Sequence, residues 1–131
     1  MAETITFGQV IPILRIFDIA KADQFYLDYL GFHVDWDHRF DDNAPLYRQV
    51  SRGALSLHLS EHHGDGSPGA RLRVTMRGVR AFHEELAAKN YPYMRPGLET
   101  TPWNTLEIGV IDPFGSVIRF SEPILGECQD T

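Results

Sequence analysis

The chain lacks most of the features that mark secreted, membrane-spanning or nucleic-acid-binding proteins. Its 131 residues include one cysteine, Cys128, so no intramolecular disulfide can form, which fits a reducing compartment. No apolar run approaches the roughly 20 residues needed to cross a bilayer, and no basic segment precedes an apolar one at the N-terminus. Twelve Lys and Arg against eighteen Asp and Glu give a net charge of −6, which disfavours nonspecific binding to the phosphate backbone of nucleic acid. We therefore expect a cytoplasmic protein without a nucleic-acid or membrane partner.

The residues that are present form an ordinary globular composition, with 43% hydrophobic and 23% charged residues. The length predicts a single domain over 1–131. The apolar, β-branched run 9–17 predicts a strand covered on both faces. Asp18 is placed to cap a helix that Gly31 ends. Turn signals then separate three short β-prone segments, at 33–38, 45–51 and 54–60.

The same order of elements returns in the second half of the chain, after a small and polar linker at 61–69. We expect a strand at 71–76, a helix that buries one face, and three more strands at 93–98, 105–111 and 116–122. The helix face consists of Val79, Phe82, Leu86 and Ala87. The sequence thus predicts an α+β fold of two βαβββ modules, at about 9–60 and 70–122, that form a curved mixed sheet around a cup.

The alternation of side chains along the strands predicts which residues face this cup. Leu55, Leu57 and Leu59 share one face, suited to packing under a helix, and leave His58 between two serines on the other. By the same rule the cup side of the second module carries Arg71, Arg73, Thr75, Thr105, Glu107, Val117, Arg119 and Ser121.

Several short motifs, taken together and in order, resemble the glyoxalase/bleomycin-resistance/dioxygenase (vicinal oxygen chelate) superfamily. They are Leu14-Arg15-Ile16-Phe17-Asp18-Ile19, Phe25-Tyr26 followed by Leu30-Gly31-Phe32, and Asp112-Pro113-Phe114-Gly115 before the last strand. The chain is most similar to the bleomycin-resistance branch, through residues 52–57 and through Pro102-Trp103. This resemblance implies a homodimer whose ligand clefts form between modules of two chains. It places Trp103 in a drug crevice, whereas the alternative for this residue is a tryptophan buried at a strand end.

Enzymes of this superfamily hold a divalent metal with side chains that point into the cup. Carrying those positions over by resemblance gives Ile11, His58, Arg71 and Arg119. Ile has no donor atom and Arg stays protonated, so three of the four ligands are missing. We therefore expect no metal and no other cofactor. A second set, His58 with His62, His63 and Asp65, remains open, although a solvated histidine pair in a Gly-rich loop is the commoner case.

The candidate ligand-binding residues are therefore aromatic or charged side chains expected on the cup side or at its rim. They are Trp36, Phe40, Tyr47, His58, Arg71, Trp103, Glu107 and Arg119. Arg71, Arg73 and Arg119 can bind an anion, or Glu107 and nearby carboxylates can neutralise them as a structural network.

The leading hypothesis is a non-enzymatic small-molecule binder that sequesters a toxic compound or antibiotic of the bleomycin type. The first alternative is a metal-dependent lyase, transferase or dioxygenase of the same superfamily, built around His58 and Glu107. The second alternative is a domain that serves only in interaction with other proteins.

Overall fold

The computed structural model describes residues 3–124. Cys128 therefore lies outside the described residues. The elements run β1 (Ile13–Arg15), α1 (Ile19–Ala22) with the π-helical continuation η1 (Asp23–Tyr29), β2 (His33–His38), β3 (Tyr47–Arg52), β4 (Leu55–Ser60), β5 (Arg71–Thr75), α2 (Val79–Ala88), β6 (Glu99–Thr100), β7 (Thr105–Ile111) and β8 (Val117–Pro123). This order confirms the predicted repeat of βαβββ. None of the described helices is long and apolar enough to cross a membrane.

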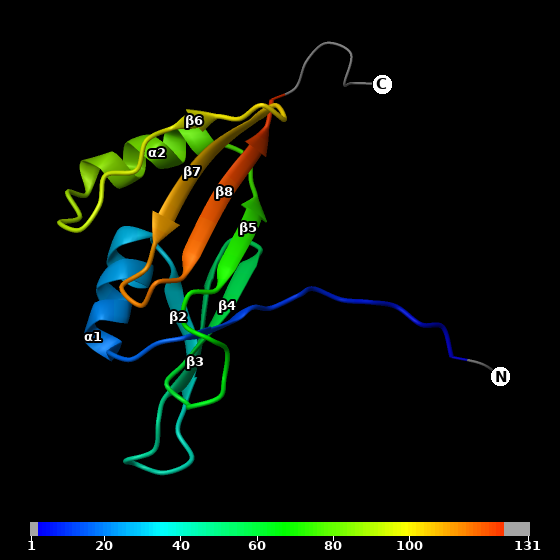
Figure 1. Ribbon diagram of the computed structural model, residues 1–131. Coiled ribbons are helices and arrows are strands. Elements are labelled where there is room, and N and C mark those ends of the chain that lie inside the picture. Colours follow the sequence, from blue (N-terminus) through cyan, green and yellow to red (C-terminus); the bar gives the residue numbers. More distant parts are fainter. Residues whose placement is uncertain (1–2, 125–131) are drawn as a thin grey trace.

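Each module forms a four-stranded mixed sheet. The first sheet has the order β1-β4-β3-β2 and the second the order β5-β8-β7-β6, so the two modules share one topology. In both, the outer first strand is parallel to its neighbour and the other pairs are antiparallel. Figure 1 shows both helices on one side of the strands, on the left. We call the opposite side of each sheet its open face.

The first helix begins and ends at the residues that the sequence indicates. The Asp18 side chain accepts a hydrogen bond from the Lys21 amide at 3.0 Å, which satisfies one of the unpaired donors at the helix start. Gly31, with φ of 80°, reverses the chain in a left-handed conformation that glycine adopts without strain. This helix buries Phe25, Tyr26 and Tyr29.

A single cluster of buried apolar side chains contains residues of both modules. It lies between the helices and the sheets and includes Leu14, Ile16, Phe25, Val50, Leu57, Leu59, Phe82, Leu86, Ile108, Val110, Ile118 and Phe120. Ala87, which the sequence places on the buried face of α2, is exposed instead. Polar contacts also join the modules, from Tyr26 to Asp112 at 2.6 Å, from Arg52 to Glu85 at 2.8 Å and from Lys89 to the Tyr29 carbonyl at 2.9 Å.

The strand predicted over 9–17 is wrong at both ends. Only Ile13–Arg15 pair with β4, and residues 3–11 are exposed, with Ile5 at 80% and Phe7 at 95%. We call residues 3–12 the arm; it runs away from the strands on the side opposite the helices (Figure 1). The apolar run predicts a strand covered on both faces, but β1 is an outer strand, and only Leu14 within it and Ile16 just after it are buried in the core.

The strand predicted over 93–98 is also wrong. Only Glu99–Thr100 pair with β7, and the preceding residues lie in irregular structure. Pro92 and Pro96 lack the amide hydrogen that a strand ladder requires, which explains why pairing begins only after them.

Candidate functional site

Three aromatic side chains meet on the open face of the first sheet. Trp36 on β2, Tyr47 on β3 and His58 on β4 come from neighbouring strands, and we call them the aromatic platform. The rings of Trp36 and Tyr47 are nearly parallel, with centroids 6.1 Å apart, and both meet His58 edge to face at 5.3 and 5.1 Å. Trp36 remains 42% exposed. The structure thus brings together three residues that the sequence predicts for the ligand site.

Hydrogen bonds fix the imidazole of His58. Gln49 donates its Nε2 to Asp35 at 3.0 Å, so its Oε1 accepts from His58 Nε2 at 3.0 Å. His58 Nδ1 must then accept from the Tyr47 hydroxyl at 2.7 Å. The hydrogen bonds from Gln49 and Ser51 lower the pKa of Asp35, whereas burial, followed by the charge of Asp65, raises the pKa of Tyr47. Both nitrogens of a neutral His58 are therefore engaged.

Phe40 extends the aromatic surface beyond the end of the sheet. Its ring lies 4.7 Å from His38 and 5.7 Å from His62, and Tyr47 lies 6.3 Å from His62. Phe40 is largely exposed. It therefore adjoins the platform.

A charged cluster occupies the open face of the second sheet. Glu107 is 1% exposed, and its Oε2 accepts from Arg73, from Thr105 at 2.8 Å and from Ser121 at 3.0 Å. Arg119 lies 3.6 Å from Glu107 Oε1, and we call Arg73, Glu107 and Arg119 the ionic cluster. Burial alone raises the pKa of Glu107, but the hydrogen bonds from Thr105, Arg73 and Ser121 hold it below its usual value. This arrangement favours the structural-network reading of these arginines.

The residues present do not fit the metal site of the superfamily's enzymes. The strand register corrects the assigned positions, because Ile13 rather than Ile11 lies beside His58, and Arg73 rather than Arg71 lies beside Arg119. The corrected positions still carry one donor side chain, His58, whose nitrogens are both hydrogen-bonded. Among residues 3–124 no group of three or more His, Cys, Asp or Glu could hold a metal ion, which also argues against the set around His62 and His63.

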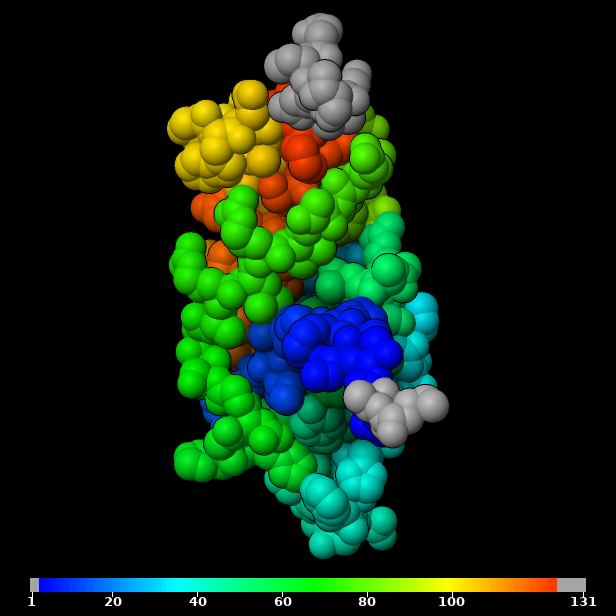
Figure 2. Space-filling view, turned by 90° about the vertical axis from the view of Figure 1, so that its right-hand side faces the viewer, coloured from blue at the N-terminus to red at the C-terminus, as the bar shows by residue number. Residues whose placement is uncertain are grey.

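The remaining predicted residues lie apart from these clusters. Arg71 opens β5 and is exposed on the same face as Arg73. Trp103 lies in the turn between β6 and β7 and is 62% exposed, so its alternative reading as a buried residue is wrong. Figure 2 shows the arm in the middle of this face of the molecule. The aromatic platform and the ionic cluster lie on separate sheets. His58 and Glu107 therefore belong to different modules.

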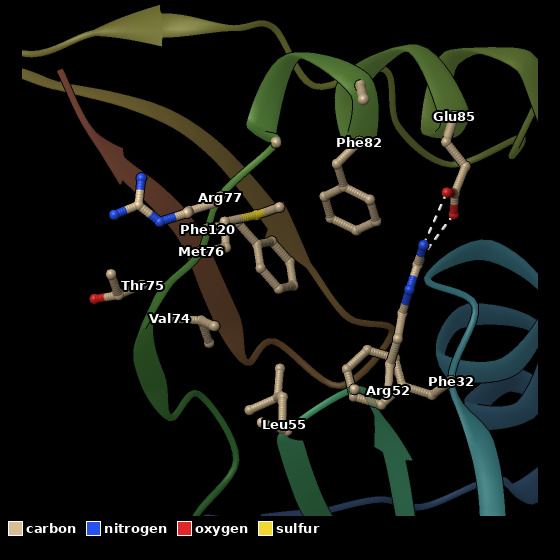
Figure 3. A pocket seen from close by; sticks show the side chains of 14 residues that line it. Phe32, Arg52, Leu55, Val74, Thr75, Met76, Arg77, Phe82, Glu85 and Phe120 are labelled. Carbon is tan, nitrogen blue, oxygen red and sulfur yellow. Dashed lines mark hydrogen bonds and ion pairs between the residues drawn. The ribbon is translucent and has the colours of Figure 1, made fainter. Parts of the chain in front are cut away.

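A cleft between the modules was not anticipated from the sequence. It has a volume of about 630 Å³ and is lined by the β3–β4 turn and Phe32 from the first module and by β5, α2 and Phe120 from the second. In Figure 3 the side chains of Leu55, Val74, Phe82 and Phe120 surround the same space. These residues appear in the sequence as ordinary core positions, so no local pattern distinguishes them.

The motifs and the fold have a match among known families. The model of the family described as glyoxalase superfamily protein matches residues 1–127. The chain belongs to the glyoxalase superfamily. This membership confirms the resemblance and the α+β fold class that the sequence predicts. A search of curated proteins finds no match.

Solved structures of the superfamily share the fold at low sequence identity. A bleomycin-binding protein in complex with bleomycin has a TM-score of 0.67 at 22% identity, covering 88% of this chain and 98% of that one. TnmS3, an antibiotic binding protein from Streptomyces sp. CB03234, has a TM-score of 0.70 at 22% identity, covering 92% and 99%. A glyoxalase-related enzyme from Clostridium phytofermentans has a TM-score of 0.72 at 20% identity, covering 94% and 100%. At these identities the superpositions establish the fold alone.

Proposed function

We propose that this protein binds a small toxic compound or antibiotic in the cytoplasm and sequesters it without chemical conversion. The aromatic platform carries the proposal. Trp36, Tyr47 and His58 present ring surface on an open face, and hydrogen bonds that extend to Asp35 hold the rings of Tyr47 and His58 in place. Prepositioned rings offer large contact area to a planar ligand at low entropic cost.

A second copy of the chain completes the site in this proposal. The open faces of both sheets lie away from the helices, and within one chain the platform and the ionic cluster lie on separate sheets. A homodimer that sets the first sheet of one copy opposite the second sheet of the other encloses the ligand between them. Trp103 and Arg71 then belong to the rim of this ligand site between the two copies. Solved proteins of the same fold that bind bleomycin and another antibiotic support small-molecule binding here.

The chemistry of the side chains favours binding over metal-dependent catalysis. Ile13, which lies beside His58 on the first sheet, and Arg73 and Arg119, which lie side by side on the second, offer no lone pair to a metal. Within the ionic cluster, Glu107 already neutralises part of the positive charge of Arg73 and Arg119. The role of the cluster in this proposal is therefore to orient a polar group of the ligand.

Titration with bleomycin tests the proposal directly. Trp36 fluorescence should change on binding, and Trp36→Ala should weaken affinity by more than about tenfold, equivalent to about 1.4 kcal/mol. Trp103→Ala should also weaken binding while leaving the fold intact, because its side chain is largely exposed. Dialysis against a chelator should leave the affinity unchanged. Unaltered bleomycin affinity in both variants, or affinity that depends on a metal, contradicts the proposal.

A further inference from the structure

We propose that the cleft between the modules is a second ligand site, selective for an uncharged aromatic compound. It is separate from the aromatic platform and from the ionic cluster, because no residue of either lines it. Its volume of about 630 Å³ lies within the range of small-molecule sites, about 300–1,000 Å³.

The wall of the cleft suits an aromatic occupant. Phe82 and Phe120 lie edge to face with centroids 5.0 Å apart, and Figure 3 shows both rings beside the cleft with Leu55 and Val74 below them. Met76 adds a polarisable thioether, which makes favourable contacts with aromatic rings. Rings and sulfur therefore surround a space in which a flat apolar molecule gains dispersion contacts on several sides.

The charges around the cleft exclude a charged occupant. Arg52 and Glu85 form a two-pronged ion pair at 2.8 and 2.9 Å, and Arg52 donates a further hydrogen bond to the Leu30 carbonyl at 2.7 Å. The guanidinium of Arg77 is directed away from Phe82 and Glu85 (Figure 3). A ligand charge would therefore have to break the Arg52–Glu85 pair or lose its hydration without a partner.

A carboxylate of the protein already occupies the first amides at the start of α2. The amides of Gly78 and Val79 both donate to the Glu122 carboxylate, at 3.0 and 2.9 Å. These donors are the ones that a bound anion would otherwise use at a helix N-terminus. Arg52, Glu85 and the amides of Gly78 and Val79 are thus already paired with groups of the protein, and the remaining wall is largely apolar.

Two related fluorescent probes test the ligand class. N-phenyl-1-naphthylamine is uncharged, and 8-anilinonaphthalene-1-sulfonate is nearly the same molecule with a sulfonate. We expect the uncharged probe to bind with one equivalent per chain and at least about tenfold more tightly than the sulfonate. Equal affinity for the two probes would overturn the selectivity, and no saturable binding of the uncharged probe would overturn the site.

A matched pair of variants on α2 locates the probe. Ala81 lines the cleft and is exposed, so Ala81→Trp should fill the space and weaken binding of the uncharged probe by at least about tenfold. Ala88 is exposed on the same helix but does not line the cleft, so Ala88→Trp should leave the affinity unchanged. Circular dichroism and urea unfolding check that both variants fold. Unchanged affinity in Ala81→Trp, or an equal loss in both variants, places the probe elsewhere and refutes the inference.

Methionine methyl signals give a readout that needs no substitution. With carbon-13 at the methionine methyl groups, the signal of Met76 in the cleft should shift on addition of the uncharged probe. The signal of Met94 should not, because Met94 lies outside the cleft. Trp36→Ala should leave these shifts intact even if it abolishes bleomycin binding. The proposal for the cleft and the proposal for the aromatic platform can therefore be refuted separately. A shift confined to Met94 would refute the assignment.

Discussion

At the scale of single residues, Glu107 shows how neighbouring donors stabilise a buried carboxylate on the open face of the second sheet. Burying an unpaired carboxylate costs several kcal/mol, so it persists only with compensating donors. Glu107 has Arg73, Thr105 and Ser121 on one oxygen and Arg119 at 3.6 Å from the other. We infer that this carboxylate holds both arginines in place on the open face.

Replacing Glu107 should therefore destabilise the protein. Glu107→Gln keeps the side-chain size but removes the charge that Arg73 and Arg119 face, and we expect a loss of about 1–3 kcal/mol of unfolding free energy in urea titrations. Glu99→Gln is the matched control. Glu99 is exposed and lies 3.6 Å from Arg119, so its replacement should cost less than about 0.5 kcal/mol. Equal effects would contradict the role given to Glu107.

The same carboxylate predicts an acid dependence of stability. Its pKa in the folded protein is lowered, so its stabilising contribution is complete above the pKa of an unfolded glutamate, about 4.3. The contribution is then lost as the pH falls through the folded pKa. The difference in unfolding free energy between the wild type and Glu107→Gln should shrink below about pH 4. A difference that stays constant down to pH 3 would argue that the charge of Glu107 does not stabilise the fold.

At the scale of elements, η1 connects the two modules through a buried hydrogen bond. Its Tyr26 donates to Asp112 in the β7–β8 turn, and Asp112 also accepts from the amides of Phe114 and Ser116 at 2.9 and 2.8 Å. Burial raises the pKa of Asp112. Burial is also the main reason that the pKa of Tyr26 is raised, and the charge of Asp112 adds to this effect. The contact therefore links the helix of one module to a turn of the other.

Two tyrosines on this helix make a controlled test of that link. Tyr26→Phe leaves Asp112 without its side-chain donor and should cost about 1.5–3 kcal/mol of unfolding free energy. The Tyr29 hydroxyl is buried without a hydrogen-bond partner among the described residues, so Tyr29→Phe should be neutral or slightly stabilising. Chemical denaturation of the two variants measures both effects. A similar cost for both would mean that the Tyr26 hydroxyl contributes nothing beyond its packing.

At the scale of the whole molecule, apolar surface remains uncovered in a single chain. Ile5, Phe7 and Val10 on the arm are almost fully exposed, and the only side-chain hydrogen bond of the described arm runs from Gln9 to the Ala54 carbonyl at 2.9 Å. Exposed large apolar side chains gathered on one segment are typical of an interface. The arm leaves on the same side as the open faces (Figure 1), which is where the proposed second copy lies.

We therefore expect the protein to sediment as a dimer of twice the chain mass of 14.9 kDa at micromolar concentration. Deletion of residues 2–8 should weaken the dimer by removing Ile5 and Phe7, while the stability of each chain changes little because these side chains make no core contact. Replacing Glu84, exposed on α2, with Ala should leave the dimer intact. A full-length protein that sediments as a monomer would contradict the proposed shared cleft.

Much of the local structure follows from the order of residues alone. The alternation in β4 and β5 predicts correctly that His58, Arg71 and Arg73 leave the helix-covered side, because a pleated strand sends successive side chains to opposite faces wherever it lies. Asp18 and Gly31 mark the helix ends for equally local reasons. The repeat of βαβββ follows from these patterns together.

Other features depend on contacts between residues far apart in the chain. The sequence places His58 and Glu107 in one cup, but their separation is set by how the modules pack, through contacts such as Tyr26 with Asp112 and Arg52 with Glu85. The same packing leaves the cleft, whose apolar lining residues are indistinguishable in the sequence from other core positions. It also leaves the arm unpaired, because an apolar run becomes a strand only where a neighbour accepts its hydrogen bonds, and β1 meets that neighbour for three residues.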